Sequence, residues 1–241
     1  MALFSGTACY NEAFREAARG GSSMSYAVKE IYYTLQGEGA QSGRPAVFCR
    51  FSGCNLWNGR EEDRAGAICT FCDTNFVGVD GPGGGRFETA EQLTEAITRA
   101  WPRCEAPSAT SGPTTRFVVC TGGEPLLQLD SALVDALHAA GFEIAVETNG
   151  TRLPPPDLDW ICVSPKGGAP LAIAGGDELK LVYPQPDAQP SAFEHLAFRH
   201  FFLSPMDGPR LSENTQAAIH YCLGHPRWKL SIQAHKLIGM P

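Results

Sequence analysis

The sequence predicts an α/β fold, a partial and open (β/α)6-type barrel with shortened helices. Apolar, strand-like runs alternate with helical segments, which is the pattern of a mostly parallel sheet. Polar or glycine-containing motifs follow several of these runs directly, at the strand ends where parallel α/β folds build their sites. The 241 residues are few for an eight-fold barrel, and some crossovers are too short for a full helix, so we expect about six barrel strands.

Each expected strand is an apolar, β-prone run that ends in turn residues. These runs are 26–35, 44–53, 116–120, 142–146, 160–163, 178–183, 200–203 and 228–232. Helices are expected at 89–99, 130–140, 191–197 and 213–223, the longer ones because apolar residues recur on one helical face. Thr89, with Gln92 three residues later, predicts the first helix cap, and Ser212 is the expected cap of the last helix.

Residues 1–23 differ from the rest and are interpreted as an N-terminal extension that could be mobile, and residues 24–241 as a single catalytic domain.

Composition and charge exclude several classes of protein. The chain carries 19 Lys and Arg against 26 Asp and Glu, and no basic block, so no nucleic-acid partner is expected. No apolar run is long enough to span a bilayer and no apolar leader is present, so we expect no membrane partner and a cytoplasmic location.

Three of the nine cysteines, Cys54, Cys69 and Cys72, follow the strand at 44–53 within one loop. An odd number of cysteines without an export signal indicates a reducing compartment, where clustered thiols bind metals or take part in catalysis. A structural zinc site would need a fourth ligand that the spacing does not supply. An electron-transfer cluster also uses four cysteines. The third alternative is a [4Fe–4S] cluster with three cysteine ligands and one open iron, and composition alone does not choose among these.

A glycine pair follows the strand at 116–120, in the motif TGGEP at 121–125. Adjacent glycines let the backbone approach a ligand closely and expose its polar groups. Glu124 can accept a hydrogen bond from a ligand ammonium group. A tight strand-to-helix turn explains the same residues equally well, so the motif alone does not define a site.

Further motifs extend from residue 33 to the C-terminus. The three-cysteine loop, Phe71 before its last cysteine, the GGE motif and a downstream ETNG together resemble the radical S-adenosylmethionine (SAM) superfamily. A finer resemblance, to the 7-carboxy-7-deazaguanine synthase family, rests on segments that occur in order at 33–39, 48–56, 72–74, 121–125, 147–150, 164–166, 204–206 and 233–236. The superfamily usually spaces its cysteines C-x3-C-x2-C, whereas 14 residues separate Cys54 from Cys69 here. An inserted loop still allows three thiolates to meet one cluster.

The resemblance implies a cofactor site. Cys54, Cys69 and Cys72 would be the catalytic cluster ligands, and SAM would chelate the open iron through its amine and carboxylate. Reduction of the cluster would then cleave SAM to a 5′-deoxyadenosyl radical. The residues that would contact SAM are Phe71, Gly123, Glu124, Glu147, Asn149, Ser164, Lys166, Ser204, Pro205, Met206 and Asp207.

The resemblance also implies a substrate and a reaction. The family converts 6-carboxy-5,6,7,8-tetrahydropterin to 7-carboxy-7-deazaguanine with loss of ammonia, a carbon–nitrogen lyase step of queuosine and 7-deazapurine biosynthesis that regenerates SAM. Mg²⁺ would be bound by Thr74 and the substrate. Arg50 suits the substrate carboxylate and Glu38 the 2-amino/N3 edge of the pterin. The expected substrate contacts are Leu35, Gln36, Gly37, Glu38, Arg50, Thr121, Gln233, His235 and Pro241.

The expected partners are the pterin, an external one-electron reductant such as flavodoxin or ferredoxin, and a second copy of the chain in a homodimer. Two alternatives remain open at this point. One is a radical SAM activating enzyme that acts on a protein partner, which would share the cysteines and the GGE motif. The other is a structural zinc-binding module without enzymatic activity.

Overall fold

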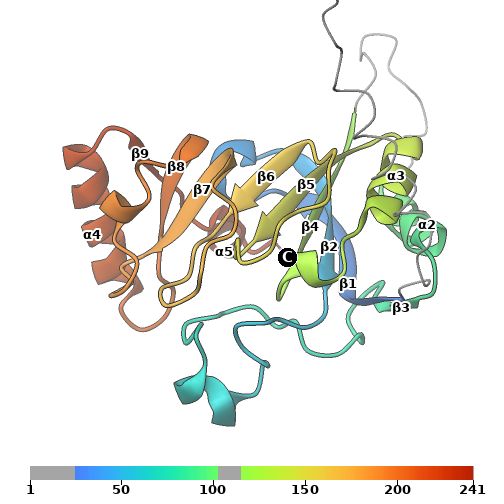
Figure 1. Ribbon diagram of the computed structural model, residues 1–241, viewed down its shortest axis with the longest axis horizontal. Helices are drawn as coiled ribbons and strands as arrows, with labels where there is room; N and C mark the ends of the chain where they lie inside the picture. The colour runs from blue at the N-terminus through green and yellow to red at the C-terminus, as the bar shows by residue number, and fades with distance from the viewer. Residues whose placement is uncertain (1–24, 103–114, 241) are drawn as a thin grey trace, which may run out of the picture.

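The computed structural model describes residues 25–102 and 115–240, and these form one nine-stranded sheet (Figure 1). The predicted extension at 1–23, and Pro241, lie outside the described residues. The order across the sheet is β3-β1-β2-β4-β5-β6-β7-β8-β9. The strands are β1 (Tyr26–Leu35), β2 (Pro45–Phe51), β3 (Gly85–Phe87), β4 (Arg116–Gly122), β5 (Phe142–Thr148), β6 (Trp160–Val163), β7 (Gly175–Tyr183), β8 (Ala197–Pro205) and β9 (Trp228–Leu230).

The sheet confirms the predicted fold class. All neighbouring strands from β2 to β9 run parallel, and only β1 pairs antiparallel, with β2 on one side and β3 on the other. The strands β2 and β4 to β8 are the six expected for an open barrel, and the three-residue β9 extends them. Because parallel strands point the same way, their carboxyl ends meet at one edge of the sheet.

The helices are α2 (Ala90–Ala100), α3 (Ser131–Ala139), α4 (Leu211–Gly224) and α5 (Ala234–Ile238), with short 3-10 turns η1 (Gly39–Gln41), η2 (Glu61–Gly66), η3 (Pro125–Leu127) and η4 (Pro190–Ala192). In Figure 1, α2 and α3 lie at one end of the sheet and α4 at the other. The crossovers at 149–159 and 164–174 contain no helix, in agreement with the predicted shortening. No helix in the described ranges is both long and apolar enough to cross a bilayer.

Local predictions were right at some helix ends and wrong at others. Thr89 caps α2 as expected, since its Oγ accepts a hydrogen bond from the Gln92 N–H at 3.3 Å. Ser212 is not a cap, because α4 already begins at Leu211. The helix expected at 191–197 is also wrong: Pro190–Ala192 forms a single 3-10 turn, and Ala197 already pairs with Gly175 of β7, which requires an extended chain.

Alternate residues of each strand face opposite sides of the sheet. On one side, Val118 and Ile144 are fully buried in the main core with the helices. On the other side, Phe48, Val119 and Ala145 form a smaller cluster. Beyond this second cluster, toward the carboxyl ends of the strands, the same side becomes polar and forms the walls of a cavity.

Candidate active site

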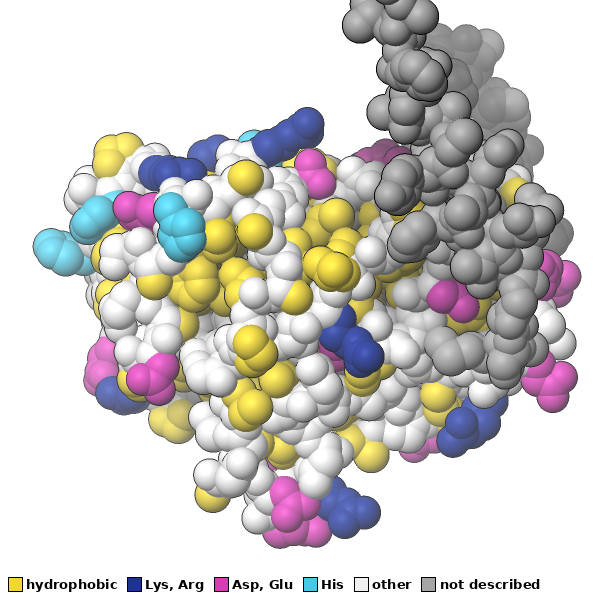
Figure 2. Space-filling view, viewed as in Figure 1, with side chains coloured by type: hydrophobic (Ala, Val, Ile, Leu, Met, Phe, Trp, Pro, Cys, Tyr) yellow, Lys and Arg dark blue, Asp and Glu magenta, His cyan; other side chains and the backbone are white. Residues whose placement is uncertain are grey.

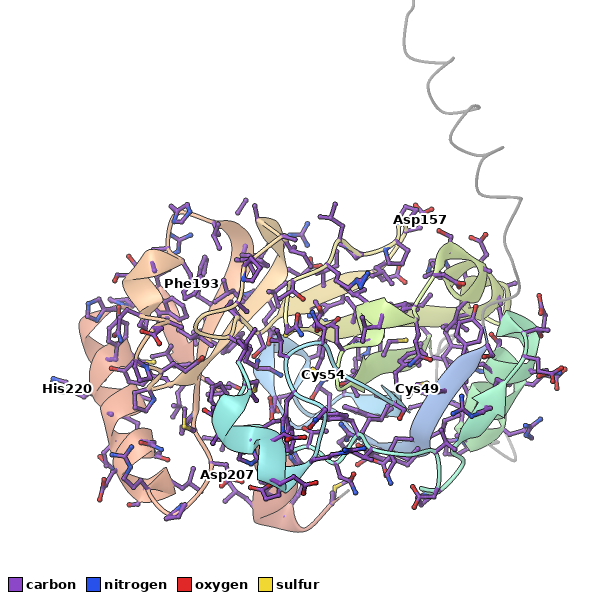
Figure 3. The ribbon with its side chains drawn as sticks, turned by 60° about the horizontal axis from the view of Figure 1, so that its bottom comes forward. Cys49, Cys54, Asp157, Phe193, Asp207 and His220 are labelled. Atoms are coloured by element: carbon purple, nitrogen blue, oxygen red, sulfur yellow. The ribbon has the colours of Figure 1, made fainter. Side chains whose placement is uncertain are left out.

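The parallel strands end around one cavity of about 410 Å³, which is within the size range of small-molecule and cofactor sites. Its walls are the ends of β1, β2 and β4 to β8, the helix α5, and the segment Cys54–Thr74, here called the cysteine loop. Figure 1 shows the cysteine loop in cyan below the sheet, and Figure 3, which turns this side forward, shows Cys54 near the middle of the molecule.

The cysteine loop leaves the end of β2 and contributes all three of its thiols to the cavity wall. The thiol of Cys69 donates a hydrogen bond to Cys72, which lowers the pKa of Cys72 to about 6 and raises that of Cys69. The amine of Lys166 lies close enough to favour the charged form of both. A lowered thiol pKa supplies thiolate near neutral pH, and thiolate is the form of cysteine that binds metals.

The insert between Cys54 and Cys69 folds back onto the cysteine loop. The Nη1 atom of Arg64, at the end of η2, donates to the carbonyls of Thr70 at 3.1 Å and Cys72 at 3.0 Å. The guanidinium lies 4.0 Å from the ring centroid of Trp57, which packs edge-to-face on Phe76. The insert therefore holds the backbone beside Cys72, while its other charged side chains gather at the outer tip (Figure 2).

The glycine pair brings the end of β4 against the root of the cysteine loop. Gly122 has a φ of 146°, and a Cβ atom there would lie 2.3 Å from the Phe51 carbonyl oxygen. A Cβ on Gly123 would lie 2.2 Å from the Gly53 carbonyl oxygen and 2.8 Å from Cβ of Cys54. Only glycine permits this approach at both positions, so the motif sets the distance between β4 and the first cysteine.

Glu124 ties the same turn to β5. Its carboxylate is fully buried and accepts hydrogen bonds from the Leu126 N–H at 2.9 Å, the Thr148 hydroxyl at 2.7 Å and the Asn149 N–H at 2.8 Å. Burial raises the pKa of Glu124, and these three hydrogen bonds oppose that rise. The side chain thus fixes the turn and does not line the cavity, unlike the SAM contact that the resemblance implied.

Elsewhere on the cavity wall, buried Lys180 and half-buried Glu38 and Glu147 form a group, here called the carboxylate–lysine cluster. Lys180 Nζ lies 2.6 Å from a Glu38 oxygen and 3.3 Å from a Glu147 oxygen. The side-chain amide of Gln36 donates to the same Glu147 oxygen at 3.0 Å. Burial alone would lower the pKa of Lys180, but the charges of Glu147 and Glu38 outweigh burial and raise it well above its ordinary value.

Arg50 lies beside this cluster on β2. Its Nε donates to Glu30 at 2.7 Å and one terminal nitrogen donates to the Tyr32 hydroxyl at 2.8 Å. Burial would lower the pKa of Arg50, but the Tyr32 and Glu30 groups raise it, so the guanidinium remains charged inside the cavity. Two of its three nitrogens are already engaged, which fixes the plane of the guanidinium.

The helix α5 covers the loop that follows β1. The Ala234 N–H donates to the Gly37 carbonyl at 3.0 Å, and a Cβ on Gly37 would lie 2.4 Å from the His235 ring. Lys236 of α5 forms ion pairs with Asp73 of the cysteine loop and with Asp207, which follows β8. One short helix therefore connects three walls of the cavity.

Comparisons with known proteins decide the family. No family model matches the chain. It is 63% identical over 218 residues to a 7-carboxy-7-deazaguanine synthase from Bordetella pertussis (strain Tohama I), covering 90% of this chain and all of the relative. The protein of the same name from Caulobacter vibrioides is 61% identical with the same coverage. The chain belongs to the 7-carboxy-7-deazaguanine synthase family. Neither alternative, the activating enzyme or the zinc module, is favoured by these relatives.

The fold agrees with that family. A crystal structure of QueE from Escherichia coli matches with a TM-score of 0.64 at 28% identity, covering 96% of this chain and all of that one. The family is a radical SAM family, which implies a [4Fe–4S] cluster and SAM as cofactors.

The donor set of this family member fits such a cluster. Among residues 25–102 and 115–240, no three His, Cys, Asp or Glu side chains are arranged to hold a single metal ion. In a cubane cluster each thiolate binds a different iron. Cys54, Cys69 and Cys72 all line one cavity, so they bring three thiols to one place, as such a cluster requires.

Nearly all of the predicted site residues meet in the cavity. Pro241 lies outside the described residues, and Glu124 is the one described exception. The predicted residues that line the cavity are Leu35, Gln36, Gly37, Glu38, Arg50, Cys54, Cys69, Phe71, Cys72, Thr74, Thr121, Gly123, Glu147, Asn149, Ser164, Lys166, Ser204, Pro205, Met206, Asp207, Gln233 and His235.

The sequence reasoning missed several charged residues of the cavity, notably Lys180, Asp73 and Lys236. A signal for Lys180 was present: within the strand at 178–183, Glu178 and Lys180 alternate with two leucines. Because side chains of a strand alternate between faces, this pattern places both charges on the side opposite the core. No comparable sequence signal pairs Lys236 with residues far away in the chain.

Proposed function

We propose that this chain is a radical SAM carbon–nitrogen lyase that converts 6-carboxy-5,6,7,8-tetrahydropterin to 7-carboxy-7-deazaguanine with loss of ammonia. The observation that carries the proposal is one cavity with three cysteine thiols on one wall and Glu38, Arg50 and His235 on the others. The first set suits the cofactor and the second suits a small, polar, carboxylated heterocycle.

When bound, the cluster and SAM would supply a 5′-deoxyadenosyl radical that abstracts a hydrogen atom from the substrate. The chain itself would hold these groups in place. Cys54, Cys69 and Cys72 would ligate three irons, and the Gly123 backbone, next to Cys54, would meet the methionyl amine. The other side chains proposed to hold SAM, all on the cavity wall, are Phe71, Glu147, Asn149, Ser164, Lys166, Ser204, Pro205, Met206 and Asp207.

Substrate recognition would rest on charge and on hydrogen-bond direction. Arg50, kept charged by Glu30 and Tyr32, would bind the substrate carboxylate. Glu38 would accept from the 2-amino and N3 positions of the pterin, which both donate. The residues proposed to complete the pocket are Leu35, Gln36, Gly37, Thr121, Gln233, His235 and Pro241. The cover that α5 forms over Gly37 supports a small, closed substrate site that keeps water from the radical.

Mg²⁺ is a further proposal, with the Thr74 hydroxyl as its ligand from the protein. A hard cation prefers oxygen donors, and Thr74 lies on the cavity wall two residues after Cys72. We predict that Thr74→Ala weakens stimulation of turnover by Mg²⁺ more than it weakens SAM binding. Titrations of activity with Mg²⁺ and of binding with SAM measure the two effects, and equal losses in both would argue against this role.

We also propose a homodimer in the cytoplasm, with an external one-electron reductant such as flavodoxin or ferredoxin. Support for the reductant comes from the chemistry, because cleavage of SAM requires an electron that no residue of the cavity supplies. Sedimentation of the purified protein tests the dimer, and turnover with each reductant in place of dithionite tests the electron donor.

The deciding experiment is anaerobic. The protein is reconstituted with iron and sulfide and reduced, and its electron paramagnetic resonance spectrum is recorded with and without SAM. A [4Fe–4S]⁺ signal that shifts on addition of SAM, followed by turnover of the carboxytetrahydropterin, is the expected result. A signal indifferent to SAM, or bound zinc without sulfide, would overturn the proposal. A shifted signal without pterin turnover would support the radical SAM chemistry and overturn the proposed substrate.

A further inference from the structure

Two carboxylates at the substrate end of the cavity share one buried cation. Lys180 of β7 is 6% exposed, and its Nζ contacts both Glu38 and Glu147. In the part of the chain that the structure describes, no other Lys or Arg forms an ion pair with either carboxylate. Lys180 therefore supplies the positive charge that allows two half-buried negative charges to lie close together.

The sheet register fixes where this charge lies. Leu179 and Leu181 are fully buried in the core on one side of β7, so Lys180 must face the cavity on the other. The backbone position of Lys180 is fixed by its pairing with Phe202 of the neighbouring strand β8. Glu38, in contrast, lies on the loop after β1, which has no ladder to hold it. The ion pair consequently anchors a loop carboxylate to a rigid strand.

The positive charge of Lys180 is matched by the negative charges of Glu38 and Glu147, because the other nearby carboxylate favours its neutral form. The charged or titratable groups that face the carboxylate–lysine cluster are Tyr32 of β1, Cys162 of β6, Lys166 after β6, Glu178 of β7 and His235 of α5. Burial raises the pKa of Glu178, which favours its neutral form. Burial also opposes ionisation of Glu38, but the charge and the hydrogen bond of Lys180 oppose burial most strongly. A hydrogen bond from Gln233 and the charge of His235 add to them, and together these groups lower the pKa of Glu38.

On the basis of the function proposed above, we propose that Lys180 is a positioning residue of the pterin subsite. Its ammonium group keeps Glu38 ionised and oriented, so that Glu38 accepts both hydrogen bonds from the 2-amino/N3 edge of the pterin. An ionised carboxylate only accepts, whereas a protonated one carries an O–H donor that faces another donor. Without Lys180, burial and the nearby Glu147 would raise the pKa of Glu38. Glu38 would then be protonated at low pH and recover as pH rises.

The test measures binding and not turnover. The probe is 6-carboxypterin, an air-stable and fluorescent pterin with the same edge, titrated into the reconstituted protein from about pH 5.5 to 7.5. We expect a nearly constant Kd for the wild type. For Lys180→Met we expect binding about 10- to 100-fold weaker at the acidic end, the cost of a hydrogen bond to a charged group, with the gap closing as pH rises. Lys180→Arg should keep the wild-type profile, and exposed Lys229→Met is the matched control.

Each outcome has a separate meaning. Failure of the wild type to bind 6-carboxypterin would overturn the proposed substrate class and leave Lys180 without a pterin to position. Wild-type binding with an unchanged Lys180→Met, or with equal weakening at every pH, would overturn only the positioning role. If Lys180→Met does not fold, the variant Lys180→Met/Glu147→Gln buries one charge fewer and gives the same readout. Its Kd must still improve as pH rises for the inference to hold.

Discussion

The two sides of the cavity are built in different ways. On the strand side, Glu147 and Lys180 project from β5 and β7, and Glu124 fastens the turn after β4, each with two or more polar partners. On the loop side, the cysteine loop contains one 3-10 turn, and only Leu56, Trp57 and Cys69 are buried within it. Side-chain contacts hold this loop in place, among them those of Asn55, Arg64 and Lys236.

This difference separates stability from chemistry. Buried polar groups with complete hydrogen bonding resist substitution because each lost partner leaves a donor or acceptor unpaired. A loop with few buried side chains contributes little to the core, so its residues are free to be selected for function rather than for stability. We therefore expect variants of the strand side to unfold more easily, and variants of the loop side to fold and lose function.

The largest expected effect on the loop side is Cys69→Ala. We predict that it abolishes SAM cleavage, because two thiolates cannot hold the cluster, while the free energy of unfolding changes by less than about 1 kcal/mol. Iron and sulfide analysis, 5′-deoxyadenosine formation and thermal unfolding of the metal-free protein measure these effects. Retained 5′-deoxyadenosine would refute the ligand assignment.

Cys120→Ala is its matched control on the strand side. Cys120 is fully buried in β4 and takes no part in the cavity. We expect this variant to bind a full cluster but to lose roughly 1–2 kcal/mol of stability through the small void left in the core. The opposite pattern in the two variants would contradict the separation between the two sides.

Glu124→Gln tests the strand side more directly. The substitution replaces one carboxylate oxygen with an N–H donor, which faces either the Asn149 N–H or the Leu126 N–H. We expect a loss of about 2–3 kcal/mol of stability, measured by urea unfolding. The exposed Glu95→Gln, which loses only a 3.7 Å surface ion pair, should change stability by less than about 0.5 kcal/mol. Equal effects of the two substitutions would show that burial of Glu124 is unimportant.

Sequence reasoning recovered the strand side well. Alternating apolar runs located every parallel strand, and the motifs at their ends located Thr121, Glu147 and Ser164 in the cavity. This succeeded because strand periodicity and the parallel arrangement are local signals that together bring the strand ends to one edge. The same reasoning placed Glu124 at the turn after β4 and expected its carboxylate to meet a ligand. The carboxylate is instead buried. This burial depends on how β4 and β5 pack, which cannot be read from a motif.

The loop side was less predictable. The residues of α5 were recognised as a motif, but its five-residue helix was not expected, since so short a helix has little intrinsic stability. Its position depends on contacts with Gly37 and Asp73, about 200 and 160 residues earlier in the chain. The helix predicted at 191–197 failed for a related reason, because pairing of Ala197 with β7 overrode the local preference.

The smallest predicted effect concerns the contact by which α5 reaches the cysteine loop. Lys236→Met removes its ion pairs with Asp73 and Asp207, whose side chains are all more than a third exposed. Exposed pairs contribute at most about 1 kcal/mol, so we expect a rise in KM of about five-fold or less, with kcat nearly unchanged. Lys229→Met is the control, and high salt should reduce the difference between the two variants.

The pH dependence of this contact gives an independent test. The hydrogen bond from Lys236 lowers the pKa of Asp207 below its ordinary value of 3.8. A lowered carboxyl pKa means that the stabilisation is present above pH 3.8 and is lost as pH falls through the lowered pKa. Amide exchange of α5 in the metal-free protein should therefore lose its protection in acid, and Lys236→Met should show the same low protection at every pH. Protection of α5 that is equal in both proteins would mean that packing on Gly37, and not the ion pairs, holds the helix over the cavity.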